Sequence, residues 1–116
     1  MPSTNSGKIQ ALNDRFRQTF QGGSVMMTRG IQALGAQAVA EILDKVRSFD
    51  AFTPDNDPYT EHDFGSFKHD GQKVFFKIDY YDQKGEFASP NLADPTKTNR
   101  VLTVMLAEEC APQALS

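Results

Sequence analysis

Hydrophobic residues recur at intervals of three and four in two stretches of the chain, and this spacing predicts two amphipathic helices. The first helix is expected at about Ser6–Gln21, where Gly22 and Gly23 follow as typical helix-ending residues. Its apolar stripe consists of Ile9, Leu12, Phe16 and Phe20. The second helix is expected at about Ala36–Phe49 and carries the stronger stripe. That stripe consists of Val39, Ile42, Leu43, Val46 and Phe49.

An Asp70-Gly71 pair between two aromatic-rich runs predicts a β-hairpin with a two-residue turn. Counting outward from the turn pairs Phe64 with Lys77 and, two residues further, His62 with Asp79. Because side chains alternate along a strand, one face of the hairpin is expected to enter the core. The core face consists of Phe67, Val74, Phe76, Ile78 and Tyr80. The second face consists of His62, Phe64, Ser66, Phe75, Lys77, Asp79 and Tyr81.

Two more apolar runs, Ser24–Thr28 and Arg100–Ala107, are consistent with strands. The fold class is therefore predicted to be α+β, with two amphipathic helices packed on a three- or four-stranded, mainly antiparallel sheet. A length of 116 residues suits a single domain, with a body at about 6–109 and frayed ends at 1–5 and 111–116. Long connections are expected at Asp50–His62 and Asp82–Asn99.

The charge of the chain narrows the range of partners. The net charge is −3, and acidic residues are concentrated in 50–89 while basic ones are scattered over 1–49. Without a dense basic face, the sequence argues against nucleic acid as a partner. It contains no apolar run that could span a membrane. The single cysteine, Cys110, excludes an internal disulfide and a thiolate zinc site, and together with an amino terminus unlike a signal peptide it favours a cytoplasmic protein.

Three strings in the chain resemble a bacterial family of small cytosolic proteins of unknown function, which is often encoded on plasmids and other mobile elements. They are Asn56–Gly65 (NDPYTEHDFG), Phe76–Asp82 (FKIDYYD) and Thr98–Ala107 (TNRVLTVMLA). The resemblance extends from about Asn13 to Glu109, with Phe76 in place of a usual tryptophan and Cys110 in place of a tyrosine. It implies a shared fold and a shared site around the NDPYTEHDFG string. It supplies no activity, and the mobile elements suggest an accessory or defence-evasion role.

Acidic residues and a histidine around that string form a candidate metal or catalytic site. With His62 opposite Asp79, an imidazole and a carboxylate would be in hydrogen-bond reach, and Asp57, Glu61 or Asp63 could complete a site for a divalent metal. The catalytic candidates are His62, Asp79 and Glu61. A structural alternative stays open, in which Asp57 and Asp63 accept backbone hydrogen bonds and His62 fixes the strand end. The chain has no HExxH motif and no glycine-rich phosphate loop.

The loop Asp50–Asp63 and the second face of the hairpin together form a candidate docking surface, because that face mixes aromatic residues with charges. The candidate binding residues are Asn56, Asp57, Tyr59, Phe64, Phe75, Lys77 and Tyr81. The alternative is that residues 82–99 cover this face as a second layer. His69, next to the turn, is expected to face solvent. The first hypothesis for function is a non-enzymatic binding or accessory protein without a cofactor, acting on a protein partner. The alternative is a small metal-dependent hydrolase or nuclease, and the oligomeric state stays open.

Overall fold

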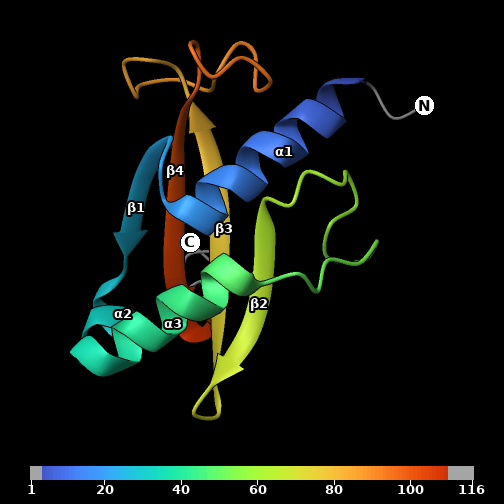
Figure 1. Cartoon of the computed structure of the whole chain (residues 1–116). Helices are drawn as coiled ribbons and strands as arrows, with labels where there is room; N and C mark the ends of the chain where they lie inside the picture. The colour runs from blue at the N-terminus through green and yellow to red at the C-terminus, as the bar shows by residue number, and fades with distance from the viewer. Residues whose placement is uncertain (1–3, 110–116) are drawn as a thin grey trace.

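The computed structural model describes residues 4–109, which form three helices and one four-stranded sheet (Figure 1). The helices are α1 (Thr4–Thr19), α2 (Arg29–Gln32) and α3 (Ala36–Ser48). The strands are β1 (Gly23–Met27), β2 (Phe64–His69), β3 (Gln72–Tyr81) and β4 (Asn99–Leu106). The strand order is β1-β4-β3-β2, with β1 parallel to β4 and the other pairs antiparallel. The predicted α+β class is confirmed, and the sheet is mixed and mostly antiparallel.

Helices α1 and α3 cover one face of this sheet, and neither of them lies over the other face (Figure 1). The core lies between the two layers, as the helical and strand periodicities predict. Its buried members are Phe16, Ile31, Ile42, Val46, Val74, Phe76, Ile78, Leu102, Val104 and Leu106. No helix within residues 4–109 is both long and apolar enough to cross a membrane.

The hairpin has the predicted turn and register. Pairing runs from His69 opposite Gln72 outward to Phe64 opposite Lys77. Asp70 and Gly71 both have positive φ, at 50° and 80°, as the two-residue turn requires. Further along β2, a Cβ at Gly65 would collide with the Phe76 ring, so the strand needs glycine where the core is tightest.

Two expectations about the hairpin histidines are wrong. The β2–β3 ladder ends at Phe64, so His62 does not face Asp79. The carbonyl of Asp63 still accepts a hydrogen bond from the N–H of Ile78 (2.8 Å), but Thr60 and His62 have positive φ and turn the chain towards α1. His69 is 5% exposed rather than solvated, because Lys45 of α3 lies against its ring, with Nζ 3.2 Å from Nδ1.

The remaining boundaries agree with the sequence to within two residues, except that α2 was not expected. Helix α1 ends at Thr19, where the chain takes positive φ at Phe20 and Gly22. The predicted frayed ends lie outside the described residues, save for residues 4–5, which belong to α1. Cys110 also lies outside them.

Candidate functional site

The connection between α3 and β2 brings His62 under helix α1 instead of beside β3. Its Nδ1 lies 2.8 Å from Oδ1 of Asp14, and its Nε2 lies 3.5 Å from Oδ2 of Asp57. The imidazole also stacks on the Phe52 ring, with centroids 3.9 Å apart and planes within 4° of each other. Both ring nitrogens therefore face carboxylates, and one ring face lies against an aromatic ring.

Asp57 and Asn56 hold the turns of the loop before His62, which is the structural role considered for Asp57. Asp57 is 5% exposed, and its Oδ1 accepts the backbone N–H of His62 (3.1 Å). Asn56 accepts the N–H of Thr53 through Oδ1 (2.9 Å). These bonds lie within the loop, so Asn56 and Asp57 stabilise its shape. Tyr59, a third predicted binding residue of the loop, is 77% exposed.

Glu61 belongs to a hydrogen-bonded network that joins α1, the loop, β3 and β4. The Tyr80 hydroxyl donates to Oε1 of Glu61 (3.3 Å), and Asn13 Nδ2 donates to the Tyr80 oxygen (2.7 Å) and to the Glu61 carbonyl (3.0 Å). Arg100 Nε donates to Oδ1 of Asn13 (2.7 Å). Asn13 is fully buried and Arg100 is 3% exposed, so this network lies inside the protein.

Burial is the main cause of the pKa shifts in this region. It raises the pKa of Tyr80, and with the charge of Asp63 it raises the pKa of Glu61. Burial also raises the pKa of Asp63, which its own backbone N–H partly offsets, and lowers the pKa of Arg100. The carboxylates of Glu61 and Asp63 are therefore partly removed from water, and neighbouring carboxylates further disfavour their ionised forms.

Arg17 lies next to this network and binds the end of helix α3. Its Nη1 donates to the carbonyls of Val46, Arg47 and Phe49 at 2.8–3.1 Å, and its Nη2 donates to Oδ1 of Asp14 (3.0 Å). A cation at these orphan carbonyls also suits the helix dipole. Asp14 is thus shared by Arg17 and His62, and it connects α1, α3 and the loop.

Sequence reasoning did not identify Asn13, Asp14, Arg17 and Arg100, although all of them except Asp14 leave a signal in the sequence. Asn13 and Arg17 fall four and eight residues after Ile9, on the apolar stripe of α1, and both are buried. A polar side chain at a stripe position indicates a buried hydrogen-bonded group. Arg100 likewise occupies a core-facing position of β4.

Asp79, the expected partner of His62, lies on the other side of the sheet. Its Oδ2 forms an ion pair with Nζ of Lys77 (3.3 Å). Among residues 4–109, no three histidine, cysteine, aspartate or glutamate side chains are placed to hold a metal ion. The predicted catalytic pair is therefore not assembled, and the catalytic and metal roles of His62, Glu61, Asp57, Asp63 and Asp79 stay predictions.

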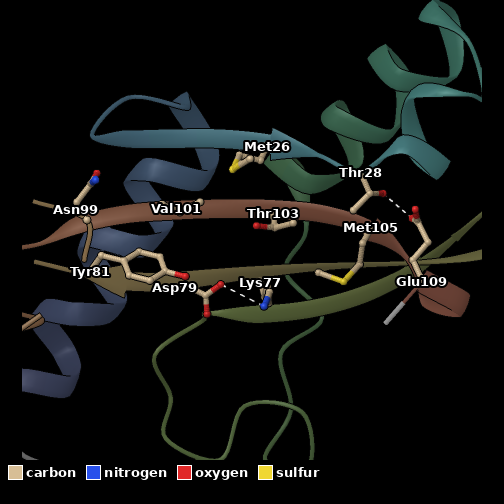
Figure 2. Close-up of a pocket in the computed structure, with 11 residues that line it drawn as sticks. Met26, Thr28, Lys77, Asp79, Tyr81, Asn99, Val101, Thr103, Met105 and Glu109 are labelled. Carbon is tan, nitrogen blue, oxygen red and sulfur yellow. Dashed lines mark hydrogen bonds and ion pairs between the residues drawn. The ribbon is translucent and has the colours of Figure 1, made fainter. Parts of the chain in front are cut away.

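The sheet surface opposite α1 and α3, here called the open face, carries the other predicted binding residues. Met26 of β1 lies beside Val101, Thr103 and Met105 of β4, and Lys77, Asp79 and Tyr81 of β3 follow on the far side, as Figure 2 shows. By strand alternation, Phe64, Ser66 and Lys68 of β2 and Lys73 and Phe75 of β3 extend the same surface. The expected second face of the hairpin is confirmed from Phe64 onward.

A groove of about 350 Å³ crosses the open face from β1 to β3. Met26 is 58% exposed and Tyr81 is 36% exposed, and the Phe64 and Phe75 rings lie 5.3 Å apart. Gly85 lines one end of the groove, while most of residues 82–98 lie beyond the ends of β3 and β4 (Figure 1). The loop therefore does not form the second layer that was the alternative to a docking surface.

Glu109 closes the opposite end of the groove. Its side chain accepts the N–H groups of Gly30 (2.9 Å) and Leu106 (2.8 Å) and the hydroxyl of Thr28. Burial alone would raise the pKa of Glu109, but these hydrogen bonds outweigh it and lower the pKa. Glu109 is thus held in place by the chain itself, whereas the groove between the two ends is unfilled by the described residues.

These features define a small two-layer α+β protein with a polar network under its helices and an open sheet face. The chain belongs to the family described as protein of unknown function DUF3768, whose model matches residues 27–109. The match includes the loop, the hairpin and β4, but not α1, which supplies Asn13, Asp14 and Arg17. No curated protein and no solved structure matches the chain.

Proposed function

We propose that the protein is a non-enzymatic binding protein that docks a protein partner on the open face of its sheet. The observation that carries the proposal is the partly exposed apolar surface on β1, β3 and β4, which none of the described helices covers. A sheet normally buries its apolar residues against a second layer. Apolar side chains that are grouped on an exposed surface are typical of interaction sites.

The composition of the open face supports this function. Tyrosine, phenylalanine and methionine are enriched at the centres of protein interfaces, and charged residues are found at their rims. The open face carries these residue types in Met26, Phe75 and Tyr81, and its Lys77–Asp79 ion pair lies among them. The Phe64 and Phe75 rings are already in contact, so a partner could dock with little rearrangement of them.

The loop of residues 50–63 fits a structural role better than a catalytic one. His62 lies between Asp14 (2.8 Å) and Asp57 (3.5 Å) with its ring stacked on Phe52, so its contacts are with the chain itself. Asp79, which the hydrolase or nuclease hypothesis places beside His62, pairs with Lys77 instead. These contacts favour binding over catalysis for this protein.

The proposed setting is the cytoplasm, with an accessory role on a mobile element. The single cysteine supports a reducing compartment. The mobile-element role rests on the family resemblance alone. A partner in this setting would be a cytoplasmic protein, either of the host or encoded by the same element.

The proposal is tested by obstructing the open face without touching the core. A photo-crosslinking amino acid at Tyr81 captures the partner in cells, and the purified partner is then titrated against the purified protein and two variants. Thr103→Arg places a large charged side chain at the centre of the open face, and we expect it to weaken binding by about tenfold or more. Ala11→Arg, at an exposed position of α1, is the matched control and should leave affinity unchanged.

Thermal unfolding monitored by circular dichroism shows whether each variant retains the fold. If Thr103→Arg keeps both its melting temperature and its affinity, the open face is not the docking surface. If Ala11→Arg loses affinity while Thr103→Arg does not, the partner binds the helical layer instead.

A further inference from the structure

We infer that the partner is an acidic segment of a protein, whose carboxylates bind the lysines at the hairpin end of the open face and whose apolar side chains enter the groove. This inference rests on the proposed function and specifies the chemistry of the partner. It starts from an arrangement of charges that the fold itself does not need.

Lys68 and Lys73 lie directly opposite each other on β2 and β3. Like charges at facing positions of a sheet destabilise the strand pair. Neither lysine forms an ion pair with any of residues 4–109. Nζ of Lys45 adds a positive charge near this end of the hairpin, since it donates to the Lys68 carbonyl (3.1 Å). The fold therefore retains a local cost that an external anion would relieve.

The carboxylates of this region do not neutralise the two lysines. Asp79 pairs with Lys77, and Glu109 is bonded to backbone N–H groups and to Thr28. Asp70 and Glu41 each lie 3.5 Å from His69 Nε2, on the covered side of the sheet. Glu108, at the end of β4, is exposed and forms no ion pair with the described residues. Lys68 and Lys73 are thus left without an ion-pair partner among residues 4–109.

The lysines lie next to apolar surface, which favours a peptide over a free anion. Nζ of Lys73 lies 5.5 Å from the centre of the Phe75 ring, and Phe75 contacts Phe64. On the adjacent strand, Met105 pairs with Phe75 and leads into the groove. A segment with carboxylates at one end and apolar residues behind them would meet both surfaces at once.

A nucleic acid fits this surface less well. On the open face, the Asp79 carboxylate beside Lys77 would repel a continuous run of phosphates. The Phe64 and Phe75 rings are inclined by 54° to each other, so they do not form the parallel platform on which successive bases stack. A protein segment can confine its acids to the hairpin end.

The test selects peptides of about 12 residues from a random displayed library, using the folded full-length protein as bait. We expect Asp and Glu to be enriched at least about twofold in the recovered peptides, together with aromatic or large aliphatic residues. The double variant Lys68→Glu/Lys73→Glu should remove or reverse the enrichment in acids. Lys8→Glu/Arg15→Glu on α1 changes the net charge equally at exposed positions and should preserve it.

Synthetic copies of a recovered peptide then give affinities by fluorescence anisotropy. We expect the hairpin double variant to bind about tenfold more weakly, and high salt to weaken wild-type binding because the contacts are ionic. Replacing the acids of the peptide by Gln should have a similar effect. If recovered peptides show no acidic enrichment, or the Gln peptide binds equally well, the inference is overturned.

The remaining outcomes separate the inference from the proposed function. Peptides that lose binding with Thr103→Arg but not with the hairpin variant leave the open face as a docking site and overturn only its acidic preference. Peptides that ignore both variants overturn both proposals. Tighter, lysine-dependent binding of a short oligothymidylate identifies nucleic acid as the ligand, and lysine-dependent self-association in light scattering identifies a second copy of the chain; each overturns the inference.

Discussion

The two faces of the sheet treat their charged groups in opposite ways. On the covered face, Arg17 and Arg100 are buried, and each reaches several hydrogen-bond acceptors on other elements. On the open face, Lys68 and Lys73 stand opposite each other with no ion pair to the described residues. The covered face thus uses its charges to join helices, loop and strands, while the open face leaves charges available.

This difference concerns the NDPYTEHDFG string in particular. The NDPYTEHDFG string has the residue types of a catalytic site, but within the structure its side chains mainly bind one another, α1 and β3. Asn13, Glu61, Tyr80 and Arg100 are bonded to one another, and a buried network of this kind favours one arrangement of the chain. We infer that the string stabilises the covered face of the sheet.

The largest expected loss of stability follows from removing the Arg17 side chain. Arg17→Ala leaves the carbonyls of Val46, Arg47 and Phe49 without their donor and Asp14 without one of its partners. Breaking such a buried arrangement should lower the free energy of unfolding by about 3 kcal/mol. Urea unfolding followed by circular dichroism measures this change.

The control for this prediction is Arg47→Ala. Arg47 forms the same kind of i,i+3 pair with Asp44, but both side chains are exposed, so we expect a loss below about 0.5 kcal/mol. Equal losses for the two variants would contradict the view that the covered face depends on its buried cations.

A smaller effect is expected from Asp63, whose pKa is raised mainly by burial. A carboxyl group with a raised folded-state pKa destabilises the fold when ionised, and this cost disappears as the pH falls through the folded-state value towards the unfolded one. Asp63→Asn should therefore be more stable than the wild type at pH 7, by less than about 1 kcal/mol. The difference should shrink towards pH 4.

Melting temperatures of Asp63→Asn and the wild type, measured from pH 7 to pH 4, show whether the variant is the more stable one and whether its advantage shrinks. Asp55→Asn is a suitable control because Asp55 is an exposed residue of the same loop. A gain for Asp63→Asn that stayed constant with pH would show that the amide forms a new hydrogen bond and that ionisation plays no part.

Local signals in the sequence were sufficient for most of the fold. The two helices follow from spacings of three and four, and the hairpin register follows from Asp70-Gly71, because the alternation of strands fixes every pair once the turn is known. Helix α2 was missed because it has only four residues, too few for a periodic pattern. The parallel pairing of β1 with β4 joins segments far apart in the chain, and no local signal reports it.

The candidate site was predicted less well, for a physical reason. The register was extended to His62 as if the strand continued, but positive φ at Thr60 and His62 redirects the chain, and such values are uncommon outside glycine. The partner that His62 then finds, Asp14, lies 48 residues away. The open face could be predicted from Phe64 onward, because its residues follow from the turn alone.

The smallest expected change in stability concerns the open face. It is a gain, whereas Arg17→Ala causes a loss. Lys68→Glu converts the facing Lys68–Lys73 pair into an attractive one and should raise the free energy of unfolding by about 0.5 kcal/mol. Lys68→Gln, which only removes the repulsion, should give part of this gain. Urea unfolding at low and high salt measures both, and salt should reduce the difference because the groups are exposed.

Lys68→Glu is most informative when both its free energy of unfolding and its binding of acidic peptides are measured. If Lys68→Glu stabilises the fold while binding of acidic peptides is lost, then the lysine pair is retained at the expense of stability, as is common for residues that serve function. If instead the variant is destabilised, Lys68 makes a favourable contribution to the hairpin, and the contrast between cations bound within the covered face and lysines left unpaired on the open face fails at the Lys68–Lys73 pair.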